Sequence, residues 1–147
     1  LVNIVIPRLN GLVVENERTW FCGKPSELQV KAFEAANAAN EAAIAALVEG
    51  NPVSAFDAAA QDVIERAGFG AHILHRTGHG MGTLGHEFPD DTAFLHRPLM
   101  ANEVYSCEPG IYLWGVGGFR QDDTVVVGRT PEVLTRAPKD LRSQTVG

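Results

Sequence analysis

The alanine-rich stretch from Lys24 to Gly50 is the feature that most constrains the fold. It reads KPSELQVKAFEAANAANEAAIAALVEG. Apolar and small residues recur along it at helical spacing: Phe33, Ala36, Asn37, Asn40, Ile44 and Leu47. We predict a long helix that begins at Ser26, a good N-cap residue, and is stopped by Gly50. An alanine-rich face favours close packing, so this helix is expected to lie against a sheet.

A second helix is predicted over residues 54–70, after Pro52. Ser54 and Asp57 are candidates to cap its start, and Gly68 is expected to end it. Its sequence, SAFDAAAQDVIERAGFG, is also rich in alanine. The chain therefore contains a consecutive pair of helices whose small side chains allow a close approach to other elements.

Strand-like segments lie on both sides of these helices. Residues 1–9 and 11–23 read as two strands joined at the hairpin-favouring pair Asn10-Gly11. After the helices, strand character returns in three segments: 103–114, 117–128 and 132–135. This order predicts an α+β domain, with one curved and mostly antiparallel sheet backed by helices.

Composition limits the classes of partner. The length of 147 residues suits one domain, and the formal net charge of −6 argues against nucleic acid or an anionic membrane as a main partner. No segment has the roughly 18 consecutive apolar residues of a membrane span, and none reads as a signal peptide, so we expect a cytoplasmic protein. Because strand character begins at Leu1 without a preceding Met, we also expect that sequence upstream is missing. Residues 136–147 are expected to form a polar, frayed tail.

Three short motifs carry residues suited to metal chemistry. The segment HRTGHGMGTLGHE, residues 75–87, places His79 among glycines at 78, 80 and 82, which we expect to let the backbone pass close to an ion or ligand. Glu108 follows in CEPG, where Pro109 and Gly110 are expected to turn the chain. The segment RQDDT places Asp122 and Asp123 on opposite faces of a strand, so only one is expected to face a shared site. One histidine and several carboxylates suit Mn, Co, Fe or Zn.

Taken in order, these motifs resemble the creatinase/aminopeptidase family, peptidase family M24, which has the pita-bread fold. The segments that carry the resemblance are RTWFCGKPSELQ, HRTGHGMG…HE, EPGIY and FRQDDTVVV. The prolidases and Xaa-Pro aminopeptidases are the members that these segments resemble in particular. The resemblance covers residues 1–135 and implies a partial pita-bread domain that lacks its N-terminal portion, followed by the tail 136–147. It also implies a homodimer.

The resemblance further implies a set of metal ligands. The family holds two ions on Asp, Asp, His, Glu and Glu, and four of these positions fall on the carboxylates or imidazole of Glu15, His79, Glu108 and Asp122. The remaining position, the first Asp, falls on Ile4, or on Val5 if the alignment has a one-residue gap. An aliphatic side chain cannot bind a metal, so the resemblance implies that at most one divalent ion is retained, or none.

The resemblance assigns roles around this centre. It places His86 against the substrate's peptide group, where it would stabilise the tetrahedral intermediate, and it places His75 in the lining of the substrate pocket. Arg120 would orient the last carboxylate ligand or pair with a substrate carboxylate, and Glu108 would act as a ligand and possible proton shuttle. These assignments name His75, His86 and Glu108 as catalytic and His75, His86 and Arg120 as substrate-binding.

Three functional hypotheses follow. The first is a metal-dependent hydrolase that resembles Xaa-Pro dipeptidases and aminopeptidases. The second is a degenerate member that binds a peptide or small molecule without cleaving it, and the third is a creatinase-like or lyase-like enzyme, since creatinase works without a metal. Simpler readings stay open at this stage: His79 and Glu108 as a buried hydrogen-bonded pair, Glu15 as a solvated strand residue, and Asp123 in place of Asp122 if the register slips by one residue.

Overall fold

The computed structural model describes residues 2–147, so Leu1, where the first predicted strand begins, lies outside the described residues. The elements in chain order are β1 (Val2–Val5), β2 (Arg8–Leu9), β3 (Leu12–Val13), β4 (Asn16–Thr19), β5 (Phe21–Cys22), α1 (Glu27–Ala46), α2 (Ser54–Arg66), η1 (Gly70–His72), η2 (Thr92–Phe94), β6 (Val104–Cys107), β7 (Gly110–Leu113), β8 (Gly117–Arg120), β9 (Asp123–Val126), β10 (Glu132–Val133) and β11 (Thr145–Val146).

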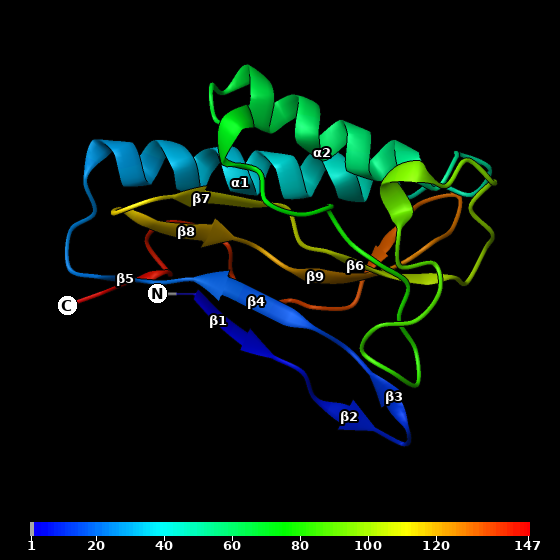
Figure 1. The fold of residues 1–147 in the computed structure, drawn as a ribbon. Coiled ribbons are helices and arrows are strands. Elements are labelled where there is room, and N and C mark those ends of the chain that lie inside the picture. Colours follow the sequence, from blue (N-terminus) through cyan, green and yellow to red (C-terminus); the bar gives the residue numbers. More distant parts are fainter. Residues whose placement is uncertain (1) are drawn as a thin grey trace.

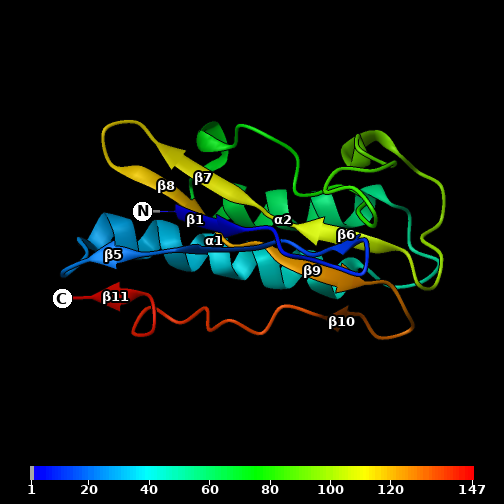
Figure 2. The ribbon, with the colours of Figure 1, turned by 90° about the horizontal axis from the view of Figure 1, so that it is seen from below.

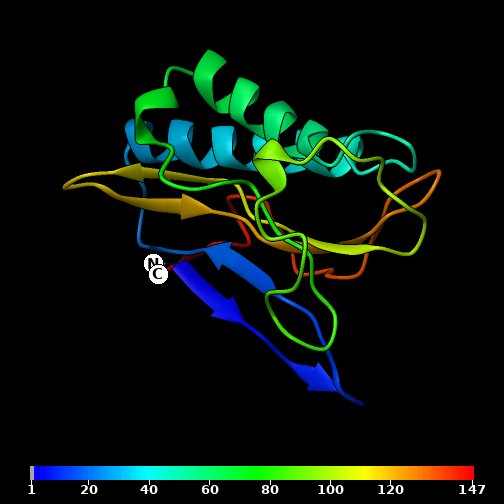
Figure 3. The ribbon, with the colours of Figure 1, turned by 45° about the vertical axis from the view of Figure 1, so that its right-hand side comes forward.

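The two helices lie together on one face of the strands, as Figures 1 and 3 show. The other face carries the antiparallel pair β1–β4 and the hairpin β2–β3, which extend away from the helices. The core between the layers is formed by alanines of α1 together with large side chains from both layers, including Phe33, Phe56, Tyr105 and Ile111. The predicted α+β arrangement of helices on a mostly antiparallel sheet is confirmed.

Helix α1 begins as the sequence predicts. The Ser26 hydroxyl accepts a hydrogen bond from the Gln29 amide, and the Gln29 side chain accepts one from the Ser26 amide, which together form a capping box. The helix ends at Ala46, before Gly50, so the predicted stop at that glycine is wrong.

No helix in residues 2–147 combines the length and apolar character needed to cross a membrane.

Helix α2 starts differently from the prediction. Its N-cap residue is Val53, and no side chain caps it. The Ser54 hydroxyl instead bonds the His96 ring, and the Asp57 carboxylate accepts a hydrogen bond from the Thr77 amide. Both side chains are used for tertiary contacts, which a local pattern cannot reveal. Gly68, with a positive φ of 86°, follows the last residues of the helix as expected.

The long predicted strands are interrupted where carboxylates lie. The segment 103–114 is divided at Glu108 between β6 and β7, and the segment 117–128 is divided at Asp122 between β8 and β9. Since β6 pairs with β9 and β7 with β8, the two interruptions lie side by side. The strand is interrupted at Glu108 and Pro109 and resumes at Gly110, so Pro109-Gly110 does not turn the chain back. Glu15 similarly lies between β3 and β4. The Thr124 hydroxyl accepts from the Glu15 amide and donates to the Glu15 carbonyl, which satisfies the backbone at that interruption.

The C-terminal segment 136–147 is not frayed, contrary to expectation. Strand β11 pairs in parallel with β5, beside which it lies in Figure 2. The Lys139 ammonium donates to Asn40 and to the Asp123 carboxylate, and Gln144 is buried. The polar composition of this segment therefore reflects specific buried contacts.

Candidate metal centre

Four acidic side chains lie close to one another and to His79: Glu15, Glu17, Glu108 and Asp122. The Nε2 atom of His79 lies 3.5 Å from Glu15 Oε2 and 3.4 Å from Glu108 Oε1. Glu17, Glu108 and Asp122 form a second group whose ligand atoms lie within 4.8 Å of one another. The structure thus brings together the four residues that the sequence suggests as ligands, although they come from separate elements. Glu15 is buried, so its reading as a solvated strand residue is wrong.

His79 is held in a fixed orientation by the backbone around it. Its Nδ1 atom lies 3.0 Å from the Gly80 carbonyl, and its own amide donates to the Ser106 hydroxyl. A proton on Nδ1 would be donated to that carbonyl, so that Nε2 faces the carboxylates of Glu15 and Glu108. Nε2 is fully buried, and the oxygens of Glu108 and Glu15 that face it lie 3.4 Å and 3.5 Å away, which is long for a hydrogen bond.

Glu17 is a member of the centre that the sequence reasoning missed. Its side chain is 2% exposed, and Oε2 accepts from Arg120 Nε at 2.6 Å. Arg120 also lies 3.4 Å from Glu108 Oε2. The guanidinium therefore pairs with Glu17 and Glu108 rather than with Asp122, the ligand that it was expected to orient. The signal that could have identified Glu17 is the alternation of strand residues, because Glu17 is two positions from Glu15.

The two neighbouring aspartates point in different directions. Asp122 lies with Glu17 and Glu108, whereas Asp123 pairs with Arg18 at 2.7 Å and with Lys139 at 3.0 Å. Asp123 also accepts from the Thr135 hydroxyl. The alternative register, with Asp123 at the centre, is therefore not the one that the structure adopts.

His86 and His75 lie at the edge of the centre. The His86 ring stacks on the His79 ring, with centroids 3.5 Å apart, and its ligand atom lies within 4.8 Å of those of Glu15 and His79. Its Nδ1 atom is 3.1 Å from Asp90, and the side chain is 59% exposed. His75 is bonded at both ring nitrogens, to the Tyr112 hydroxyl at 2.6 Å and to the Arg76 carbonyl at 2.7 Å. His86 is thus the more accessible of the two to a ligand from solvent.

The glycines beside His79 serve backbone packing rather than ligand approach. A Cβ atom built on Gly78 would lie 2.0 Å from the Ser106 carbonyl oxygen, and one on Gly80 would lie 2.8 Å from the Phe88 carbonyl oxygen. Only glycine allows these contacts, which set the segment of His79 directly against β6. The expectation that they leave room for an ion is therefore corrected.

The carboxylates are buried with too little positive charge to balance them. Burial disfavours the charged imidazolium, but interaction with the Glu108 and Glu15 carboxylates outweighs burial and raises the pKa of His79 to about 10. Desolvation raises the pKa of Asp122 well above its ordinary value, and the negative charges of Glu108, Glu15 and Glu17 add to this. For Glu108, burial is outweighed by His79 and Arg120, so its pKa is lowered. The centre attracts cations.

The residues present fit a divalent ion. Asp122 is completely buried, and within residues 2–147 neither of its carboxylate oxygens has a hydrogen-bond partner. A buried carboxylate without a partner is costly. A cation of the Mn, Co, Fe or Zn type would satisfy it, and a mixed set of imidazole and carboxylate ligands suits these ions.

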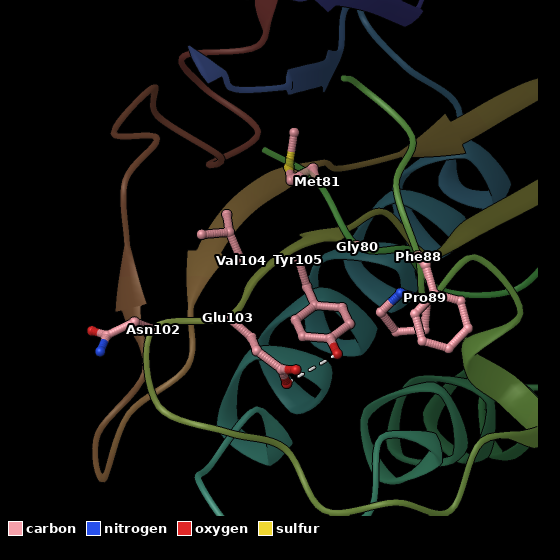
Figure 4. A pocket seen from close by; sticks show the side chains of 8 residues that line it. All are labelled: Gly80, Met81, Phe88, Pro89, Asn102, Glu103, Val104 and Tyr105. Carbon is pink, nitrogen blue, oxygen red and sulfur yellow. Dashed lines mark hydrogen bonds between the residues drawn. The ribbon is translucent and has the colours of Figure 1, made fainter. Parts of the chain in front are cut away.

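Two surface hollows lie outside this centre. One, of about 220 Å³, is lined by Gly80, Met81, Phe88, Pro89, Asn102, Glu103, Val104 and Tyr105, and Figure 4 shows the Tyr105 hydroxyl bonded to Glu103 inside it. The other, of about 610 Å³, surrounds the β7–β8 hairpin tip at Trp114. Neither lining includes a candidate ligand.

Comparison with known proteins identifies the family. The model of metallopeptidase family M24 matches residues 4–129. The chain belongs to metallopeptidase family M24. It is 35% identical over 134 residues to an Xaa-Pro dipeptidase of Lactobacillus helveticus, and 37% identical over 134 residues to a putative dipeptidase, YkvY, of Bacillus subtilis. Each alignment covers 90% of this chain, but only 36% and 37% of those relatives.

Solved structures of M24 members give the same fold. The prolidase of Pyrococcus horikoshii superposes with a TM-score of 0.91 at 28% identity, over 95% of this chain and 41% of that one. The pita-bread fold is therefore established for this chain, which spans a little over a third of the length of the curated relatives it matches. Ile4 and Val5, the two positions on which the resemblance places the first Asp ligand, are 45% and 55% exposed on β1.

Proposed function

We propose that this chain contributes the metal centre of a hydrolase that acts on Xaa-Pro dipeptides or on peptides with an N-terminal Xaa-Pro bond. The observation that carries the proposal is the fully buried Asp122 carboxylate beside Glu17 and Glu108, neither oxygen of which has a hydrogen-bond partner among residues 2–147. The dipeptidase names of the M24 relatives support the substrate class.

Glu15, His79, Glu108 and Asp122 would hold the ion. A bound divalent ion supplies Lewis acidity, which lowers the pKa of a bound water and polarises a carbonyl. Arg120 holds the Glu108 carboxylate by an ion pair and so fixes the ligand's orientation. His86 would donate to the oxyanion of the tetrahedral intermediate, because it is exposed beside the cluster and its Nδ1 atom is held by Asp90.

The first test is hydrolysis of an Xaa-Pro dipeptide by the complete protein after loading with Mn²⁺ or Co²⁺. We expect Asp122→Asn and His79→Ala to weaken metal binding and abolish hydrolysis, whereas His86→Ala should lower kcat about 10²–10³-fold and leave metal affinity nearly unchanged. His72→Ala, at a residue outside the cluster, is the control. Absence of bound metal after loading would refute the proposal.

A second candidate function is recognition of an organic cation without a metal. It is favoured by one observation: the guanidinium of Arg120 already lies between the carboxylates of Glu17 and Glu108. A substrate with a guanidinium or amine group would match the remaining carboxylates in the same way, as the creatinase-like and binding-only hypotheses require. Binding of such cations by metal-stripped protein, with no cleavage of Xaa-Pro dipeptides, would favour this candidate.

The homodimeric state, the cytoplasmic location and the boundary between residues 1–135 and 136–147 stay predictions. Sedimentation velocity of the purified protein would test the first of these. We expect a dimer, because an unpaired strand edge favours association.

A further inference from the structure

The missing first ligand of the M24 pattern has a direct structural neighbour. Strand β1 pairs with β4 in antiparallel register, and the residue opposite Ile4 is Glu17. Side chains directly opposite each other in an antiparallel pair lie on the same face, with Cβ atoms about 4.5–5.5 Å apart. The Cβ atom that carries the side chain of residue 17 therefore lies close to the Cβ atom of residue 4, on the same face.

The surroundings of Glu17 are those of a ligand rather than of a surface acid. Its side chain is buried, and its carboxylate joins those of Glu108 and Asp122 in a group within 4.8 Å. Both Arg120 contacts fall on Oε2, so Oε1 stays outside the ion pair. The independent sign that this group accepts a cation is Asp122, which is fully buried and lacks a partner for either oxygen among residues 2–147.

The ligand atoms of the centre divide into two groups that share no residue. One contains Glu15, His79 and His86, and the other contains Glu17, Glu108 and Asp122. The first has two imidazoles and one carboxylate, and the second has three carboxylates. The second group by itself offers three protein ligands, which are sufficient for an ion that keeps open positions for water or substrate. The loss at Ile4 therefore does not by itself reduce the centre to one ion.

We propose that Glu17 supplies from β4 the carboxylate that position 4 of β1 lacks, and that with Glu108 and Asp122 it completes a second divalent-cation position. This inference rests on the proposed metal-dependent function, and it changes the expected number of ions from one to two. In this arrangement the ligand carboxylate is on β4 instead of β1, and its side chain lies on the same face of the strand pair.

The test is the metal stoichiometry of the purified protein. Metal-stripped protein is titrated with Mn²⁺ by calorimetry, and bound metal is counted by mass spectrometry. We expect two ions per chain in the wild type and one in Glu17→Gln, with loss of the spin-coupled Mn–Mn signal in the electron paramagnetic resonance spectrum. Glu41→Gln, an exposed acid on α1, is the control and should still bind two ions.

A reciprocal variant keeps the test informative if Glu17→Gln is poorly folded. Glu17→Thr should bind one ion, and Ile4→Asp combined with Glu17→Thr should again bind two, because the carboxylate returns to β1 on the same face.

A wild type that binds one ion, with no change in Glu17→Gln, would overturn this inference while leaving the proposed function intact. A wild type that binds no ion would refute the proposed function itself. Loss of both ions in folded Glu17→Gln would also overturn the inference.

Discussion

The protonation of His79 and Asp122 follows from the same imbalance of charge. Glu15, Glu17 and Glu108 surround them, and Arg120 is the cation that pairs directly with two of these carboxylates. In the absence of a metal, both residues gain from holding a proton, since each proton reduces the negative charge of the buried cluster. Metal binding would replace those protons and would therefore become tighter as the pH rises.

A pH dependence of stability follows for metal-stripped protein. The pKa of His79 is raised from 6.5 to about 10, so its stabilising contribution is complete below pH 6.5 and is lost as the pH rises through about 10. The raised pKa of Asp122 also lowers the free energy of unfolding as the pH rises, beginning at the ordinary pKa of 3.8. We expect the free energy of unfolding in urea with EDTA to fall between pH 6 and pH 9.

Asp122→Asn is the matched variant for that measurement. An amide neither ionises nor takes up a proton, so the variant lacks the free-energy cost that the raised pKa of Asp122 imposes above pH 3.8. The metal-stripped variant should therefore be more stable than the wild type at pH 8. With Mn²⁺ present the order should reverse, because the variant has lost a ligand. A wild-type stability that rises with pH in EDTA would contradict this account.

The two helices show that a helix start can be set by local or by tertiary contacts. At α1 the capping box lies wholly within the sequence Ser26 to Gln29, so the pattern is sufficient. At α2 the two candidate capping side chains form other hydrogen bonds: Ser54 bonds the His96 ring, and Asp57 accepts from the Thr77 amide. The Asp57 contact joins α2 to the segment that carries His79, which ties the helix layer to the metal centre.

This difference can be measured at two serines. Ser26→Ala removes the N-cap hydrogen bond and should lower the free energy of unfolding by about 1 kcal/mol. Ser54→Ala removes only an exposed contact with His96 and should cost less than about 0.5 kcal/mol. Urea denaturation of both variants at one pH gives the comparison. Equal losses would show that Ser54 acts as a cap after all.

Across the whole molecule, Asp123 connects segments that are far apart in the chain. Its carboxylate pairs with Arg18 of β4 and with Lys139 of the C-terminal segment, and Arg18 also donates to the Ala137 carbonyl. Burial is outweighed by Lys139, Thr135 and Arg18, so the pKa of Asp123 is lowered and the carboxylate stays charged. This network fixes the residue next to Asp122 and so determines which aspartate faces the metal centre.

We expect Asp123→Asn to be strongly destabilising. It leaves Arg18 buried without its carboxylate, a change that typically costs about 3–5 kcal/mol. Asp62→Asn, which breaks an exposed pair with Arg66 on α2, is the control and should cost at most about 0.5 kcal/mol. Urea denaturation measures both, and limited proteolysis should show earlier cleavage within 136–147 in the first variant. A loss below 1 kcal/mol would show that the network adds little.

The sequence by itself determined the element types, the hairpin turn at Asn10-Gly11 and the start of α1, and its resemblance to family M24 supplied four candidate ligands that the structure brings together. These features depend on residues that are near each other in the chain or on motifs in a fixed order. The tertiary structure decided the rest. Glu17 joined the centre through strand register, Asp122 was separated from Asp123 by the Arg18 network, and residues 136–147 were ordered by buried contacts. Each of these outcomes depends on a partner about 90 or more positions away, and no local pattern specifies which distant group will be there.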